Sequence, residues 1–224
     1  MNASVSRTAA RQRFTNPPVS TLRPLPVDLR QKVFQRNRRR LVVLAVDLSD
    51  SMGDGPSNRM SAALGTALAL AQQSYLNRDQ VSLVTFRDQT AQVVLPPTGS
   101  VTLIRRKLGK LAIGGATPLA DGLLTALRVI RQAQGKQPGL EPLLVLLSDG
   151  EATAPKAPGG DPVREAMEAA GKIRQAKVPV LLVDTSTGLQ TSSLMPQLAD
   201  IFETHRHRLQ SLTAGQVLEL MDPS

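Results

Sequence analysis

A stretch of thirteen residues, LVVLAVDLSDSMG at 41–53, constrains the fold more than any other segment of the chain. Its six leading residues are apolar and rich in valine and leucine, which is typical of a strand buried on both faces of a parallel sheet. The strand is expected to end at Asp47, and Ser49 and Ser51 follow at alternate positions. Ligands of open α/β sheets bind where the parallel strands end. Oxygen-bearing side chains at that point predict a site for a hard cation such as Mg²⁺.

Short apolar runs alternate with longer, helix-forming segments along the rest of the chain. Further strands are expected at residues 81–86, 91–95, 142–148, 178–183 and 205–209. Helices are expected at residues 59–75, 101–111, 119–134, 162–175, 194–202 and 213–221. The strands 81–86 and 91–95 are so close in sequence that they must form an antiparallel hairpin, and Pro96 and Pro97 are expected to stop the second of them. The pattern predicts an α/β fold with a doubly wound, mostly parallel sheet, one antiparallel edge strand and helices on both faces.

The positive charge of the chain is concentrated at its beginning. Residues 1–40 hold ten lysines and arginines and one acidic residue, whereas residues 41–224 hold 17 basic and 17 acidic residues. The first 26 residues are rich in arginine, serine, threonine and proline, which is typical of extended or disordered chain. We therefore expect a basic, largely extended arm at 1–40 and one globular domain at 41–224. The arm is either simply solvated or contacts an acidic protein surface; nucleic-acid binding through it would be electrostatic and non-specific, and is less favoured.

The composition excludes several classes of protein. The chain has no cysteine, which excludes a disulfide framework, a thiolate metal site and a cysteine nucleophile. The only histidines, His205 and His207, have no third ligand nearby and are interpreted as surface residues. No apolar run approaches the roughly 20 residues of a membrane helix, and the basic N-terminus lacks the apolar core of a secretory signal. These features predict a soluble, cytoplasmic protein.

Two further segments are expected to bring oxygen ligands to the same edge of the sheet. The loop GGATP at 114–118 holds Thr117, which is also placed to cap the helix that follows. The strand 142–148 is followed by Asp149. In this prediction the hydroxyls contact the ion and the aspartates hold its water molecules. An ion with so little protein charge around it can accept a carboxylate from a partner.

Together these residues resemble the metal-ion-dependent adhesion site of the von Willebrand factor type A family, whose pattern is Asp-x-Ser-x-Ser, a distant Thr and a distant Asp. The matching residues are Asp47, Ser49, Ser51, Thr117 and Asp149, in that order. The resemblance covers roughly residues 41–222. Within the family the chain looks most like the C-terminal domain of the magnesium chelatase D subunit and related cobalt-chelatase subunits. This likeness is carried by the pieces DLRQKV, NRMSAALGTAL, GGATPLADGL, LLSDGEAT, GGDPVREAMEAA and VLLVDT.

The resemblance implies a protein-binding function that depends on Mg²⁺, or alternatively on Mn²⁺ or Ca²⁺. It implies a non-catalytic adaptor for an AAA+ ATPase, in a chelatase complex of tetrapyrrole biosynthesis or in a MoxR-type chaperone system. The ATPase or the large chelatase subunit would complete the metal site with an acidic residue. The chain departs from the family in three ways: only a basic arm precedes the domain, no GxxxxGK[ST] motif is present, and Asp50 replaces the usual glycine.

Other interpretations of the same residues were weighed against this one. Serine, threonine and Asp-Gly pairs often serve only as turn or cap residues, although an ordered match at five positions disfavours that explanation. Asp184 and Thr185, after another strand, are expected to be structural, with a contact at the rim of the site as the second choice. The basic run 105–110 is interpreted as a solvated helix face. Enzymes at the same strand end are disfavoured, because the Asp-x-Asp, G-x-S-x-G and G-x-G-x-x-G motifs are absent.

Overall fold

A computed structural model describes residues 39–50, 59–186 and 193–209 of the chain. Its core is a six-stranded sheet in the order β3-β2-β1-β4-β5-β6, in which β3 alone is antiparallel to its neighbour. The strands are β1 (Arg40–Asp47), β2 (Gln80–Arg87), β3 (Thr90–Thr98), β4 (Glu141–Ser148), β5 (Val180–Asp184) and β6 (Arg206–Arg208). The helices are α1 (Arg59–Leu76), α2 (Val101–Leu108), α3 (Leu119–Lys136), α4 (Pro162–Gln175) and α5 (Met195–Phe202).

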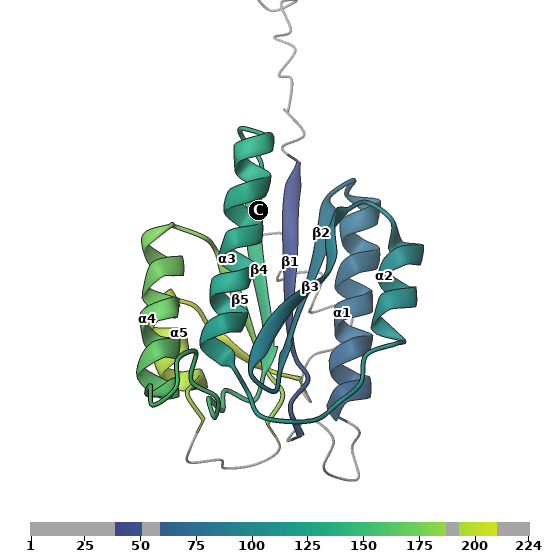
Figure 1. The fold of residues 1–224 in the computed structure, drawn as a ribbon. Coiled ribbons are helices and arrows are strands. Elements are labelled where there is room, and N and C mark those ends of the chain that lie inside the picture. The colour runs from purple at the N-terminus through teal and green to yellow at the C-terminus, as the bar shows by residue number, and fades with distance from the viewer. Residues whose placement is uncertain (1–38, 51–58, 187–192, 210–224) are drawn as a thin grey trace, which may run out of the picture. The chain divides into compact units, whose positions relative to one another are not determined.

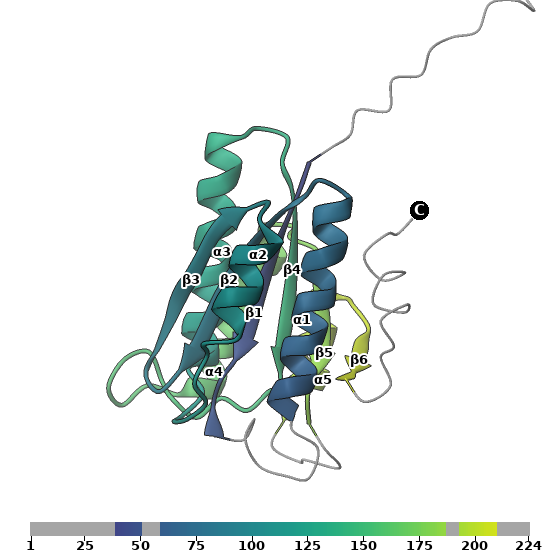
Figure 2. The ribbon, with the colours of Figure 1, turned by 90° about the vertical axis from the view of Figure 1, so that its right-hand side faces the viewer.

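Helices cover both faces of this sheet, as Figures 1 and 2 show. One apolar layer joins the sheet to α3, α4 and α5, and a second joins it to α1 and α2. The central strand β1 is buried along nearly its whole length, which explains its unbroken apolar sequence. Gly122 allows α3 to approach the sheet closely, because a Cβ there would lie 2.6 Å from Cδ1 of Phe86. The predicted α/β class and the antiparallel edge strand are confirmed.

Two local predictions were wrong. The strand expected to stop at Pro96 continues as β3 through both prolines to Thr98. Prolines are tolerated in edge strands and at bulges, and here both lie where the register between β2 and β3 shifts. The helix expected at 101–111 ends at Leu108, with Gly109 as its C-cap.

The strand order places a topological switch point at β1. The chain leaves β1 for α1 on one face of the sheet and leaves β4 for α4 on the other face, while β1 and β4 pair directly. Connections that diverge to opposite faces leave a crevice between the carboxyl ends of the two strands, where ligands of such sheets bind. The predicted metal site lies at this edge.

Three sequence predictions fall outside the described residues: nearly all of the basic arm at 1–40, Ser51, and the helix at 213–221. The division into an arm and a domain at 41–224 therefore stays a prediction. Within the described ranges, no helix is long and apolar enough to cross a membrane.

Candidate metal centre

The aspartate at the end of β1 is held by hydrogen bonds to both of its oxygens. Asp47 is fully buried. Its Oδ1 accepts a hydrogen bond from the backbone N–H of Ser49 over 3.0 Å, and its Oδ2 accepts one from the hydroxyl of Ser148 over 2.6 Å. Burial raises the pKa of Asp47 to about 7; the bond from Ser148 opposes this rise, and the nearby charge of Asp149 adds to it. A cation beside Asp47 would favour its charged form.

Ser148 is a supporting residue that sequence reasoning missed. It is the last residue of β4 and is fully buried. Its hydroxyl donates to Asp47 and accepts a hydrogen bond from the backbone N–H of Gly150 over 3.0 Å. The signal that could have found it is a serine directly before Asp149, at the end of a strand that pairs with β1. Ser148 ties the ends of the two strands together.

The aspartate after β4 has one oxygen without a partner. Asp149 is fully buried, and its Oδ1 accepts a hydrogen bond from the backbone N–H of Glu151 over 3.1 Å. Its Oδ2 has no hydrogen-bond partner in the described part of the chain. Ser193 fixes the position of the turn, because its hydroxyl donates to the carbonyl oxygen of Asp149 over 2.6 Å. A buried carboxylate oxygen without a partner costs on the order of several kcal/mol unless a cation or a donor meets it.

The glycine-rich loop reaches the same edge through backbone hydrogen bonds. Gly114 donates to the carbonyl of Leu48 over 2.9 Å, and Asp50 donates to the carbonyl of Gly115 over 3.0 Å. Gly115 has a φ of 82°, and a Cβ there would collide with Asp88. Glycine is therefore the residue that lets the loop lie against the end of β1.

Thr117 is buried beside this loop, but it does not cap α3 as predicted. The N-cap position is Pro118, and no side chain caps the helix there. The backbone N–H of Thr117 donates to Oγ1 of Thr153 over 2.8 Å, and the N–H of Thr153 donates to the carbonyl of Thr117 over 3.1 Å. These bonds fix the Thr117 backbone, while its hydroxyl has no hydrogen bond to another described residue. A structural capping role therefore does not explain this threonine.

Four of the five predicted site residues thus lie at one edge of the sheet, where β1 and β4 end (Figure 1). They are Asp47, Ser49, Thr117 and Asp149, and each is at most 2% exposed. The fifth, Ser51, lies outside the described residues. Asp50 is exposed, so its additional charge faces solvent at the rim.

The chemistry of this set fits a hard cation that keeps part of its water. Carboxylates and hydroxyls are the oxygen ligands that Mg²⁺ and Mn²⁺ accept. In the described ranges, no three histidine, cysteine or acidic side chains cluster as a metal cage would require. An ion at this edge would therefore depend on hydroxyl and water ligands, and the unpartnered Oδ2 of Asp149 is the group that such an ion or its water would satisfy.

The other candidate residues lie away from this centre or serve the fold. Asp184 is buried at the end of β5; its Oδ1 accepts from the N–H of Ser186 over 2.8 Å, and Arg206 lies 3.4 Å from its Oδ2. His205 is exposed and His207 half-buried, and both line a hollow of about 590 Å³ at the amino ends of the strands. Burial lowers the pKa of His207, and the neighbouring His205 lowers it further. Neither histidine is placed to reach the candidate centre.

Residues 42–151 match the family model of the von Willebrand factor type A domain. Magnesium-chelatase subunits from several bacteria share 30–37% identity with the chain. The 60 kDa subunit of Cereibacter sphaeroides, for example, is 37% identical over 75% of this chain. That alignment covers 30% of the relative, so the chain spans about a third of the length of these proteins.

Solved structures show the same fold at low sequence identity. The VWA domain of SpRpn10 covers 83% of this chain and 95% of its own, with a TM-score of 0.60 and 16% identity. A manganese-loaded TRAP protein of Plasmodium vivax covers 84% of this chain and 73% of its own, with a TM-score of 0.59 and 15% identity.

Proposed function

Because the chain carries a von Willebrand factor type A domain related to magnesium-chelatase subunits, we propose that it is a non-catalytic, Mg²⁺-dependent protein-interaction module. In this proposal it is an accessory subunit of an AAA+ ATPase in a magnesium- or cobalt-chelatase-like complex. It contacts the ATPase, the large chelatase subunit or both, and it acts in the cytoplasm.

The observation that carries the proposal is the buried, unpartnered Oδ2 of Asp149, which lies beside Asp47 at the switch point of the sheet. Two buried carboxylates that raise each other's proton affinity are unfavourable without a cation. The manganese-loaded relative in fold supports a divalent ion at such a site. We propose Mg²⁺, with Mn²⁺ and Ca²⁺ as alternatives that the same oxygens would accept.

In the proposed site the hydroxyls of Ser49, Ser51 and Thr117 hold the ion, and Asp47 and Asp149 hold its water molecules. The ion, when bound, supplies a positive centre that can take a carboxylate from the partner. Ser148 keeps Asp47 oriented, and the bonds between Thr117 and Thr153 keep the threonine in place. The described part of this edge holds no histidine, which supports a contact point rather than an acid–base catalyst.

Two alternative functions follow from other features. The domain would serve a MoxR-type AAA+ chaperone system equally well, since the same metal-dependent contact would recruit that ATPase. The ten basic residues of 1–40 would instead support association with nucleic acid. The first alternative keeps the metal-dependent contact and differs in the partner, whereas the second does not need the metal.

The proposal is tested by substituting the threonine of the site. Thr117→Ala is expected to lower Mg²⁺ affinity at least tenfold in calorimetric titration and to abolish capture of the AAA+ or large subunit, while circular dichroism stays unchanged. EDTA should release the captured partner from the unmodified chain. Thr90→Ala, an exposed threonine on β3, is the matched control and should change neither. Partner capture that is equal with Thr117→Ala and with EDTA would contradict the proposal.

A further inference from the structure

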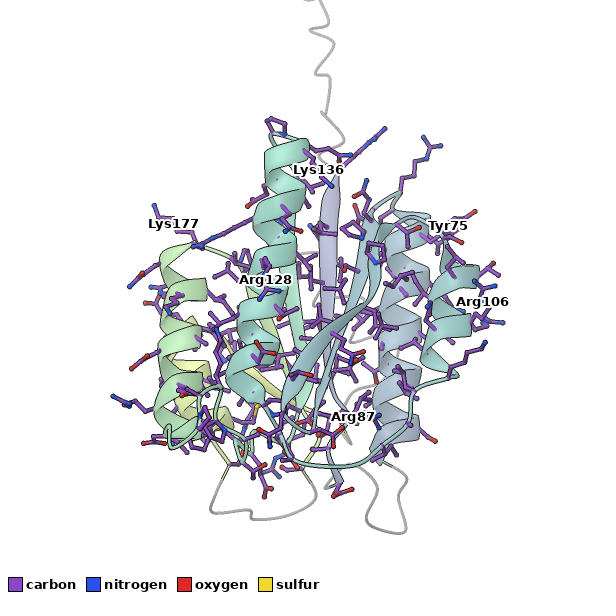
Figure 3. The ribbon with its side chains drawn as sticks, viewed as in Figure 1. Tyr75, Arg87, Arg106, Arg128, Lys136 and Lys177 are labelled. Carbon is purple, nitrogen blue, oxygen red and sulfur yellow. The ribbon has the colours of Figure 1, made fainter. Side chains whose placement is uncertain are left out.

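The surface of α2 carries a concentration of positive charge that the metal site does not use. Three of its basic residues lie in the last turn of the helix, and a fourth follows directly after it. They are Arg105, Arg106, Lys107 and Lys110. From residue 89 to residue 120 the chain holds no acidic residue. Figure 3 shows Arg106 on the outer side of α2, extended away from the sheet.

Neighbouring elements do not neutralise this charge. The helix packed beside α2 is α1, and its sequence contains no acidic residue. Of the acids before α2, Asp79 is buried and accepts from the backbone N–H of Arg40, and Asp88 pairs with Arg87 at 3.5 Å. None of the four cations of α2 forms an ion pair with another residue in the described ranges. The surface is therefore an uncompensated positive patch.

A basic last turn alone has an ordinary explanation, because cations stabilise the carboxyl end of a helix. The same effect applies to α4, which ends with Lys172 and Arg174. That helix also carries acidic residues, and Arg174 pairs with Glu203. By contrast α2 has only cations, and Lys110 lies beyond the helix, so the helix end does not account for the whole patch.

The patch is continuous with the candidate metal centre. The segment after α2 runs along the edge of the sheet to Thr117 (Figure 1). Gly114 and Gly115 hydrogen-bond to the end of β1, and the Arg87 side chain donates to the carbonyl of Ala112 over 3.2 Å. A partner bound at the metal edge would therefore meet this basic surface next.

We propose that α2 and Lys110 form a docking surface for an acidic polypeptide segment of the partner. This inference rests on the proposed function, in which the same partner supplies a carboxylate to the ion. A run of Asp and Glu beside that carboxylate would complement the four cations, speed the encounter and fix the orientation of the partner. The interpretation of residues 105–110 as a merely solvated helix face is thereby replaced.

The test compares two double charge reversals. Arg106→Glu with Lys110→Glu changes the docking surface, whereas Arg128→Glu with Arg131→Glu changes an equally exposed pair on α3, on the other face of the sheet. The probe is a fluorescent poly-L-glutamate peptide of about 20 residues, titrated at low and high salt. The α2 variant is expected to bind the peptide at least tenfold more weakly and with a smaller salt dependence. The α3 variant should bind the peptide like the unmodified chain, and Mg²⁺ affinity should be unchanged in both variants.

Each result separates the docking surface from the metal site. If the α2 variant binds the peptide as tightly as the α3 variant does, the docking surface is refuted, whatever EDTA does. If the α2 variant alone loses binding while EDTA has no effect, the docking surface stands and the metal-dependent contact fails. Tighter binding of a single-stranded oligonucleotide of the same length, lost in the same variant, would also overturn the choice of an acidic polypeptide.

Discussion

At the scale of single residues, Asp47 couples the stability of the domain to pH. Its pKa is raised from 3.8 to about 7 by burial, so between these pH values the folded chain keeps a proton that the unfolded chain has lost. The free energy of unfolding of the metal-free chain should therefore fall as pH rises through this window, by at most about 1.4 kcal/mol per pH unit. Urea unfolding at several pH values measures the slope.

The matched variant for this prediction is Asp47→Asn, which cannot ionise and should flatten the dependence. Saturating Mg²⁺ should also reduce the slope, because a cation favours the carboxylate form. An equal slope in the variant and the unmodified chain would assign the pH dependence to other groups.

Two buried serines allow the site to be separated from the core. Ser148 donates to Asp47 over 2.6 Å, whereas Ser82 donates to the carbonyl of Leu95 over 2.8 Å in the β2–β3 hairpin. Each serine-to-alanine change should destabilise the fold by about 1–3 kcal/mol, because a buried group loses its hydrogen bond. Only Ser148→Ala should also weaken Mg²⁺ binding, since it alone orients a site residue. Calorimetric titration that finds equal Mg²⁺ affinities in the two variants would contradict this role.

At the scale of elements, the contact between α3 and the sheet positions Thr117 at the start of the helix. Gly122 faces Phe86, and an added Cβ would lie 2.6 Å from its ring, whereas a Cβ at Gly135 of the same helix would meet nothing within 4 Å. Gly122→Ala should therefore cost about 1–3 kcal/mol of stability through overpacking. Gly135→Ala should be neutral or add up to about 1 kcal/mol. Thermal unfolding of both variants checks this, and similar effects at the two glycines would refute the close packing.

Elements also differ in how far their sequence determines them. The burial of β1 and β4 could be predicted, because a strand covered on both faces must be apolar throughout. The end of β3 could not, since Pro96 and Pro97 are tolerated only because this strand lies at the edge and bulges there. The capping role expected of Thr117 failed for a similar reason: its backbone is held by Thr153, which lies 36 residues away in sequence.

At the scale of the whole molecule, charge is distributed for contact with other proteins. The domain from 41 to 224 is neutral overall, so its positive patch on α2 must be balanced by acidic residues elsewhere. The chain spans about a third of the magnesium-chelatase subunits it resembles. A domain of this size with its ligand edge exposed to a partner suits an accessory role, and the proposed AAA+ partner would supply the ATP-driven step.

The sequence alone determined the fold class and the residue types of the candidate site, because both depend on local patterns: strand and helix periods, and polar residues directly after apolar runs. The tertiary structure decided which of these residues meet. The pairing of β1 with β4 brings Ser148 to Asp47 across 101 residues of chain, and the buried turn after β4 leaves Oδ2 of Asp149 without a partner. Strand order and side-chain hydrogen bonds are long-range properties, so only the folded chain shows that the two carboxylates share one crevice.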